Sequence, residues 1–173
     1  MNAATLALES RRLYERSRAI NGAGLALVFA APFGCVSMAC CAFPRVTITL
    51  GLFLGVVVFL SRRRGQWLAR GLYPGLVAGS LGFVLPIACR TLMPMCSGQM
   101  CFVPLAWVVG VGIVCGGVAV ALAPSGSRSP TLLIAYLLGS MGALAGGLAG
   151  PVALAGGVLV GAAVGAGAKV VSE

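Results

Sequence analysis

The side chains of this 173-residue sequence that could do chemistry are seven cysteines. There is no histidine, and the three acids are Glu9, Glu15 and Glu173. General acid–base catalysis, a catalytic triad and a hydrolytic zinc site all need histidines or carboxylates close to the reacting atoms. The middle of the chain holds neither residue type, so we expect a protein that is not an enzyme.

Three kinds of thiol chemistry fit these cysteines. A disulfide between Cys96 and Cys101, or from Cys89 to either, would staple a loop in an oxidising compartment. An all-sulfur site would suit a soft metal ion such as Cu(I), Hg(II) or Cd(II), which is the one cofactor that the residues suggest. A redox relay is the third reading, although the C-x-x-C pair typical of disulfide exchangers is absent from the sequence.

The cysteines lie in or between long apolar segments. Only 9% of the residues are charged, against about 25% in a typical soluble domain, and the mean hydropathy is +1.05. A helix that crosses a hydrocarbon core of about 30 Å needs roughly 17–25 apolar residues. We therefore predict an all-α, polytopic transmembrane bundle of about six short, glycine-rich spans in three helical hairpins. The spans are 19–43, 46–60, 71–89, 102–123, 131–149 and 151–168.

These spans form a single transmembrane domain over residues 19–173. The alternative is four firm spans with an interfacial or re-entrant hairpin over 131–168, since only Gly150 and Pro151 separate the last two segments. Pro32 and Pro86 lie inside spans, where a proline removes a helical hydrogen bond and favours a kink.

The basic residues predict an orientation. With both termini in the cytoplasm, ten basic residues lie inside and two outside, as the positive-inside rule requires. We therefore expect an integral protein of the bacterial inner membrane that contacts anionic lipids and binds no nucleic acid. The inner residues are Arg11, Arg12, Arg16, Arg18, Arg62, Arg63, Arg64, Arg70, Arg128 and Lys169; the outer ones are Arg45 and Arg90.

Residues 1–18 read as a short amphipathic helix before the first span. Leu6, Leu13 and Ile20 repeat every seven residues and give a narrow apolar stripe. One interpretation is an interfacial helix with its arginines at lipid phosphates, and the other is a docking helix for a cytoplasmic partner. In both, the lipid or partner contacts are made by Arg11, Arg12, Arg16 and Arg18, together with Arg62, Arg63 and Arg64 in the next inner loop.

The predicted orientation places five cysteines at the outer face. They are the candidate metal ligands or disulfide partners: Cys40, Cys41, Cys89, Cys96 and Cys101. Cys35 and Cys115 lie deeper, about 12 and 20 Å from that boundary at 1.5 Å per residue. We expect these two to act as small apolar packing residues.

Two weak resemblances concern the same cysteines. The run Ala39-Cys40-Cys41-Ala42-Phe43-Pro44 resembles the vicinal cysteine pair before proline in the first span of mercuric transport proteins. Cys96 and Cys101 before Phe102-Val103-Pro104 are similar to their second pair, although that pair is cytoplasmic and those proteins have fewer spans. Six short spans with outer cysteines, together with the stretch from Cys101 into the glycine-rich last span, resemble six-span membrane anti-sigma factors that respond to heavy metals.

Glycines recur at every fourth residue in the last two spans. Such faces let helix backbones approach closely in lipid, where van der Waals contact stabilises the pair. The two spans should pack on each other or on the rest of the bundle; the alternative is a homo-oligomer or a contact with other subunits of a membrane complex. The glycines are Gly142, Gly146 and Gly150, followed by Gly157, Gly161 and Gly165.

The sequence thus favours a non-enzymatic, multi-pass inner-membrane protein with an outward cysteine cluster. We expect it to act as a thiophilic-metal or redox-responsive sensor or carrier. The alternatives are a small structural or accessory subunit, assembled through the glycine faces, and a passive channel. A proton-coupled pump is disfavoured, because no carboxylate, lysine or histidine lies mid-membrane.

Overall fold

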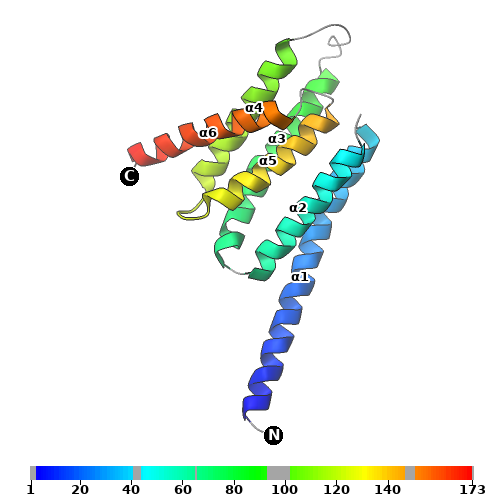
Figure 1. Ribbon diagram of the computed structural model, residues 1–173, viewed down its shortest axis with the longest axis vertical. Helices are drawn as coiled ribbons and strands as arrows, with labels where there is room; N and C mark the ends of the chain where they lie inside the picture. Colours follow the sequence, from blue (N-terminus) through cyan, green and yellow to red (C-terminus); the bar gives the residue numbers. More distant parts are fainter. Residues whose placement is uncertain (1–2, 41–43, 65, 93–101, 147–150, 173) are drawn as a thin grey trace.

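The computed structural model describes residues 3–40, 44–64, 66–92, 102–146 and 151–172, and within these ranges the protein is all-α (Figure 1). Its six helices follow the apolar segments of the sequence. They are α1 (Ala3–Cys40), α2 (Pro44–Arg64), α3 (Gln66–Leu92), α4 (Phe102–Leu122), α5 (Arg128–Ala145) and α6 (Pro151–Ser172).

Four helices are long and apolar enough to cross a membrane. The qualifying segments have 18 to 20 residues, which is about 27–30 Å of helix. They are Arg45–Arg64 in α2, Arg70–Cys89 in α3, Leu105–Leu122 in α4 and Val152–Val171 in α6. The chain is therefore a multi-pass integral membrane protein, and the finer prediction of six spans depends on α1 and α5.

Helix α5 differs from the four in its surroundings. It has 18 residues, and all of those from Leu137 to Ala145 are buried. It contacts every other helix of the bundle. A helix that is surrounded by protein on most sides has little need of an apolar surface toward lipid.

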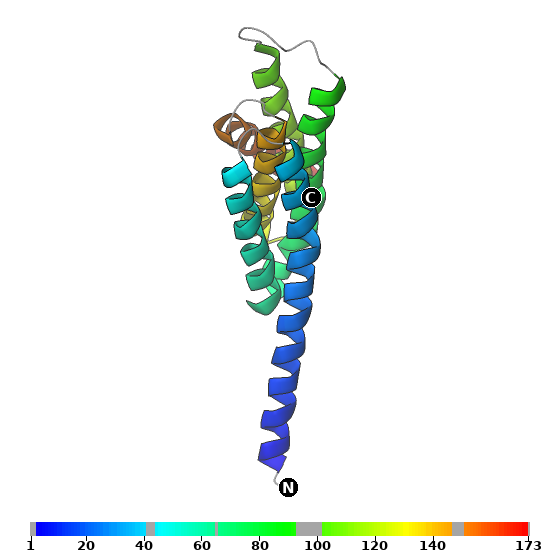
Figure 2. The same ribbon diagram turned by 90° about the vertical axis from the view of Figure 1, so that its right-hand side faces the viewer.

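Helix α1 does not divide as the sequence predicted. The expected amphipathic segment 1–18 and first span 19–43 form one helix over the described residues from Ala3 to Cys40, 38 residues in all, or about 57 Å. No proline interrupts residues 3–31, and Gly22 lies against α2, where an added Cβ would be 3.3 Å from the Cβ of Arg62. The first turns of α1 consequently project beyond the rest of the bundle (Figures 1 and 2).

Helix α2 is longer than the predicted span 46–60. It begins at Pro44, where the fixed φ of proline suits a first turn, and it continues through Arg62, Arg63 and Arg64. Cations in the last turn stabilise a helix because they face its partial negative charge. The arginines therefore extend this helix instead of ending it.

The helices pair differently from the three expected hairpins. Helix α1 packs on α2, but the closest partner of α3 is α5 and that of α4 is α6. Both of these pairs run parallel. Gly75 and Gly79 of α3 face successively later residues of α5, and Gly112 and Gly116 of α4 face successively later residues of α6. Helices that are joined by a short turn must run antiparallel, so parallel partners are never consecutive in the chain.

Glycines make both parallel contacts close. A Cβ at Gly142 of α5 would overlap the backbone of Phe83, and one at Gly146 would lie 3.0 Å from the carbonyl oxygen of Pro86. In the other pair, a Cβ at Gly161 of α6 would overlap the carbonyl of Ile113 in α4. The glycine faces of the last two spans are thus used within the chain, against α3 and α4 and not against each other.

Three apolar clusters fill the remaining space. The largest joins α2, α3 and α5 around Leu54, Phe83 and Met141. A second joins α4, α5 and α6 around Val108 and Leu154. A third is built of small side chains where α3, α4 and α5 meet: Ala78, Cys115, Ala119 and Ala135.

The glycine contacts lead to a stability prediction. Gly161→Ala adds a methyl group against the backbone of α4, and such overpacking typically lowers stability by about 1–3 kcal/mol. Gly156→Ala is the matched control in the same helix, because a Cβ there meets no atom within 4 Å. Reversible unfolding in mixed micelles should show a loss for the first variant only, and equal stability of the two would contradict the α4–α6 contact.

Candidate functional site

The two ends of the bundle carry different chemistry. Cys40 is the last residue of α1 and Cys89 lies three residues before the end of α3, and both helix ends lie at the same end of the bundle (Figures 1 and 2). Helices α2 and α4 begin at that end with Pro44 and Phe102. We call it the thiol end.

The described part of the thiol end holds two of the five candidate cysteines. Cys41, Cys96 and Cys101 lie outside the described residues. Cys89 is a half-buried free thiol, and α1 has no contact with α3 in the ranges described. The structure therefore brings Cys40 and Cys89 to one end without joining their helices, and the described residues contain no group of three metal-ligating side chains.

Two further cysteines lie within the helices. Cys35 of α1 is an exposed free thiol. Cys115 of α4 is buried, and its Sγ lies 3.1 Å from the carbonyl oxygen of Ala78 in α3 and 3.7 Å from that of Ala135 in α5. It therefore fills the junction of three helices and donates a weak hydrogen bond there, which extends the packing role expected from the sequence.

The opposite end carries most of the basic residues, and we call it the basic end. Helix α2 finishes there with Arg62, Arg63 and Arg64, which are all exposed. Arg18 of α1 donates from its guanidinium to the carbonyl oxygen of Arg62 at 3.3 Å. Its guanidinium also lies 5.6 Å from the ring centroid of Tyr14, within the range of a cation–π contact.

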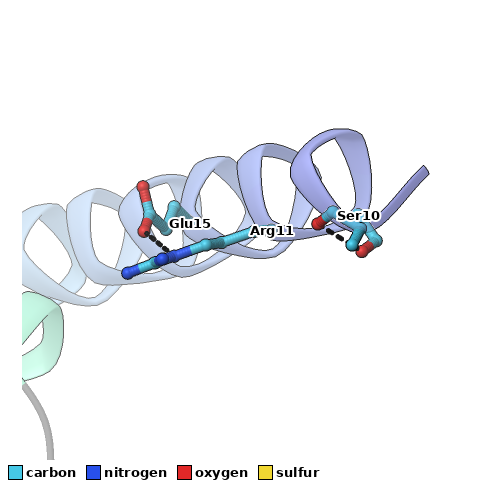
Figure 3. Close-up of polar contacts among 4 residues, drawn as sticks. Ser10, Arg11 and Glu15 are labelled. Atoms are coloured by element: carbon cyan, nitrogen blue, oxygen red, sulfur yellow. Dashed lines mark hydrogen bonds and ion pairs between the residues drawn. The ribbon is translucent and has the colours of Figure 1, made fainter. Parts of the chain in front are cut away.

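The projecting part of α1 carries the other candidate arginines. Arg11, Arg12 and Arg16 are exposed. Arg11 pairs with Glu15 one turn later at 3.4 Å, and the Ser10 hydroxyl donates to the carbonyl of Ala7 (Figure 3). An exposed pair at this spacing contributes only about 0.3–0.5 kcal/mol. These contacts leave the surface of the segment available to lipid or a partner.

Lys169 connects α6 to the end of α4. Its Nζ donates to the carbonyl oxygen of Ala123 at 2.7 Å. The last carbonyls of a helix lack intrahelical donors, so a lysine that reaches them satisfies a hydrogen bond and faces the negative end of the dipole. Lys169 and Arg18 thus act alike: each is a basic side chain of one helix that caps the end of another.

Sequence reasoning overlooked the glycines opposite the two ladders. Gly71, Gly75 and Gly79 of α3 face α5, and a Cβ at Gly79 would lie 2.6 Å from a methyl group of Leu138. Gly112 and Gly116 of α4 face α6. All five stand at the same four-residue spacing that identified the later ladders, so the signal was present in the sequence. Gly150 lies outside the described residues.

Comparison with known proteins gives no relative. No protein-family model, curated protein or solved structure matches this sequence. Any function must therefore be argued from the two ends of the bundle and from what lies between them.

The cap on α4 can be tested by substitution. Lys169→Met keeps most of the side-chain volume but removes the donor, so we expect a loss of about 1–2 kcal/mol in unfolding free energy. Lys169→Arg should retain most of the stability. Arg63→Met removes an equal charge from the exposed end of α2 and serves as the control. If this control were as destabilised as Lys169→Met in mixed-micelle unfolding, net charge and not the cap would explain the effect.

Proposed function

We propose that this protein is a non-enzymatic membrane sensor for a thiophilic ligand, which it binds through cysteines at the thiol end. The carrying observation is that Cys40 and Cys89 lie at one end of the bundle (Figure 1). Cys41 follows Cys40 in the sequence, and Cys101 directly precedes the first residue of α4, which begins at that end. Chain connectivity therefore supports bringing further thiols to the same region.

The distribution of charge supports an orientation for this end. Arg18, Arg62 and Lys169 make their contacts at helix ends away from the thiols. Arginine and lysine are enriched on the cytoplasmic side of membrane proteins. We therefore propose that the basic end is cytoplasmic, that the thiol end faces outward, and that the membrane is a bacterial inner membrane.

The packing between the two ends favours a sensor over a carrier or channel. The described helices enclose apolar clusters, and buried hydroxyls such as those of Ser61 and Thr131 donate to carbonyls of their own helices. An ion that crosses a bilayer needs polar groups along its path. The described interior offers few, so the proposed ligand stays at the outer end.

Helix α1 supplies a route by which binding outside could be registered inside. It is one continuous helix from Cys40 to the projecting segment, and its contacts in the described ranges are with α2 and α5. Its contact with α2 is looser than the glycine contacts elsewhere: a Cβ added at Gly55 of α2 would lie 3.5 Å from the Cβ of Ala30 in α1. A helix held in this way can shift as a unit between two packed positions.

A structural or accessory subunit is the second candidate. The exposed apolar residues of α6, among them Leu159, Val160 and Val164, could contact another subunit as readily as lipid. The glycine faces no longer support this candidate strongly, because Gly157 and Gly161 already pack against α4 of the same chain.

Ligand binding at the thiol end can be measured by protection from labelling. In a background that carries Cys35→Ala and Cys115→Ala, we expect Hg(II) or Cd(II) added outside to block labelling of Cys41 and Cys96 by an impermeant maleimide. If several sulfurs share the ion, the double variant Cys40→Ala, Cys41→Ala should lower the affinity for the metal at least tenfold. A tenfold change in affinity corresponds to about 1.4 kcal/mol. Mass mapping without reductant gives the matching control for disulfides. Labelling that is unaffected by either metal would contradict the proposal.

Sensing, as distinct from carriage, can be tested at the other end of α1. In inside-out vesicles, trypsin should cleave after Arg11, Arg12 and Arg16, and we expect Hg(II) enclosed in the lumen to change that rate. Metal flux into the medium should stay at the level of protein-free vesicles. Metal that protects the thiols but crosses the membrane without altering cleavage would identify a carrier instead.

A further inference from the structure

A groove opens on the outer surface of α4 beside α3. It has a volume of about 510 Å³ and is lined by Leu85 of α3 and by Ala106, Trp107, Gly110, Val111 and Val114 of α4. Ala106, Trp107 and Val114 are exposed, whereas Val111 is buried at the wall toward the bundle. The five side chains among these residues are apolar apart from the indole N–H of Trp107. The groove therefore offers shape and apolar contact, with almost no hydrogen-bonding capacity.

The hollow exists because of Gly110. A Cβ built at this glycine meets no atom within 4 Å. Its neighbours in sequence behave differently, since a Cβ at Gly112 would lie 2.8 Å from the carbonyl oxygen of Leu154 in α6. Gly112 is thus required by the packing of α4 on α6, whereas Gly110 serves no helix contact in the described chain. Other helical glycines are also open, namely Gly24, Gly34, Gly156 and Gly167, but Gly110 is the one of them that lines the groove.

The groove lies at the depth of the hydrocarbon core. Its residues on α4 fall within the membrane-crossing segment Leu105–Leu122, and Leu85 falls within Arg70–Cys89. From Ala106 to Val114 the groove follows about 12 Å of helix. Apolar cavities of this kind do not hold ordered water, because water needs polar partners there. The material that the bilayer supplies at this depth is the acyl chain of a lipid.

We propose that this groove binds one acyl chain of a bilayer phospholipid, retained more firmly than the lipids around the rest of the bundle. A chain that lies along Gly110 contacts protein on several sides, with Leu85, Trp107 and Val111 as walls, and gains close packing that a convex helix surface cannot give. A second copy of this protein is the rival occupant, because Ala106 and Gly110 stand four residues apart, the spacing that lets two helices approach closely; the experiments below separate the two. The inference is independent of the thiol chemistry.

The test counts lipids that remain bound after extraction in mild detergent. Native mass spectrometry of the wild-type protein should show one retained phospholipid. Gly110→Leu fills the groove and should reduce its occupancy about tenfold, which corresponds to about 1.4 kcal/mol of lost packing contact. Gly156→Leu is the matched control, because this glycine of α6 also has nothing within 4 Å and lies outside the groove; it should retain the lipid.

A fluorescence measurement tests the same groove in a bilayer. If Gly110→Leu does not fold, Gly110→Val takes its place in both experiments. With Trp67→Phe as background, Trp107 is the one tryptophan left. Lipids brominated on the acyl chain should quench it at low mole fraction in the wild type and in Gly156→Leu, and less in either Gly110 variant. Equal lipid retention and quenching in all variants would overturn the proposal. A dimer that Gly110→Leu dissociates would also overturn it, in favour of a second copy.

Discussion

The arrangement of this protein depends on close contact between helix backbones at glycine. Inside a bilayer, the burial of apolar side chains brings helices together only weakly, because lipid tails are as apolar as leucine. Contact area must come from close approach, and here it comes from two parallel pairs, α3 with α5 and α4 with α6. Gly142 rests on the backbone of Phe83 and Gly161 on that of Ile113. A larger residue at either position would force the helices apart along their whole contact.

This constraint also limits where chemistry can occur. Close packing brings α3, α4 and α5 together at Ala78, Cys115 and Ala135, where the Cys115 thiol lies within reach of carbonyls of two neighbouring helices and donates its one weak hydrogen bond there. Little room or polarity remains for a substrate between the helices. The ends of the bundle, where thiols or charges accumulate, are therefore the places at which this chain could meet a polar ligand or a metal ion.

The sequence predicted the helices well and their partners poorly, for physical reasons. Length and hydropathy locate α2, α3, α4 and α6 to within a few residues, since the bilayer thickness sets the length of a span. The boundaries erred where charge was taken as a stop signal: Arg62 to Arg64 continue α2, and Arg18 lies inside α1. Pairing could not be read from hydropathy, because residues that face lipid and residues that face protein are both apolar. The repeated glycines of α3 carried that information.

In the candidate site, too, one part could be predicted from the sequence and another could not. Charge segregation follows from the order of residues along the chain once the spans are known, and the structure shows why it also stabilises the fold: Arg18 and Lys169 each cap the end of a neighbouring helix. The thiols have no comparable pattern. Their meaning depends on distances between segments that are far apart in sequence, and α1 does not touch α3 in the described ranges. A ligand that bridges Cys40 and Cys89 would therefore have to draw together two helices that now belong to different packing units. Of these two helices, α3 belongs to a glycine-packed pair and α1 does not, so α1 is the one that such a ligand would move with the smaller loss of contact.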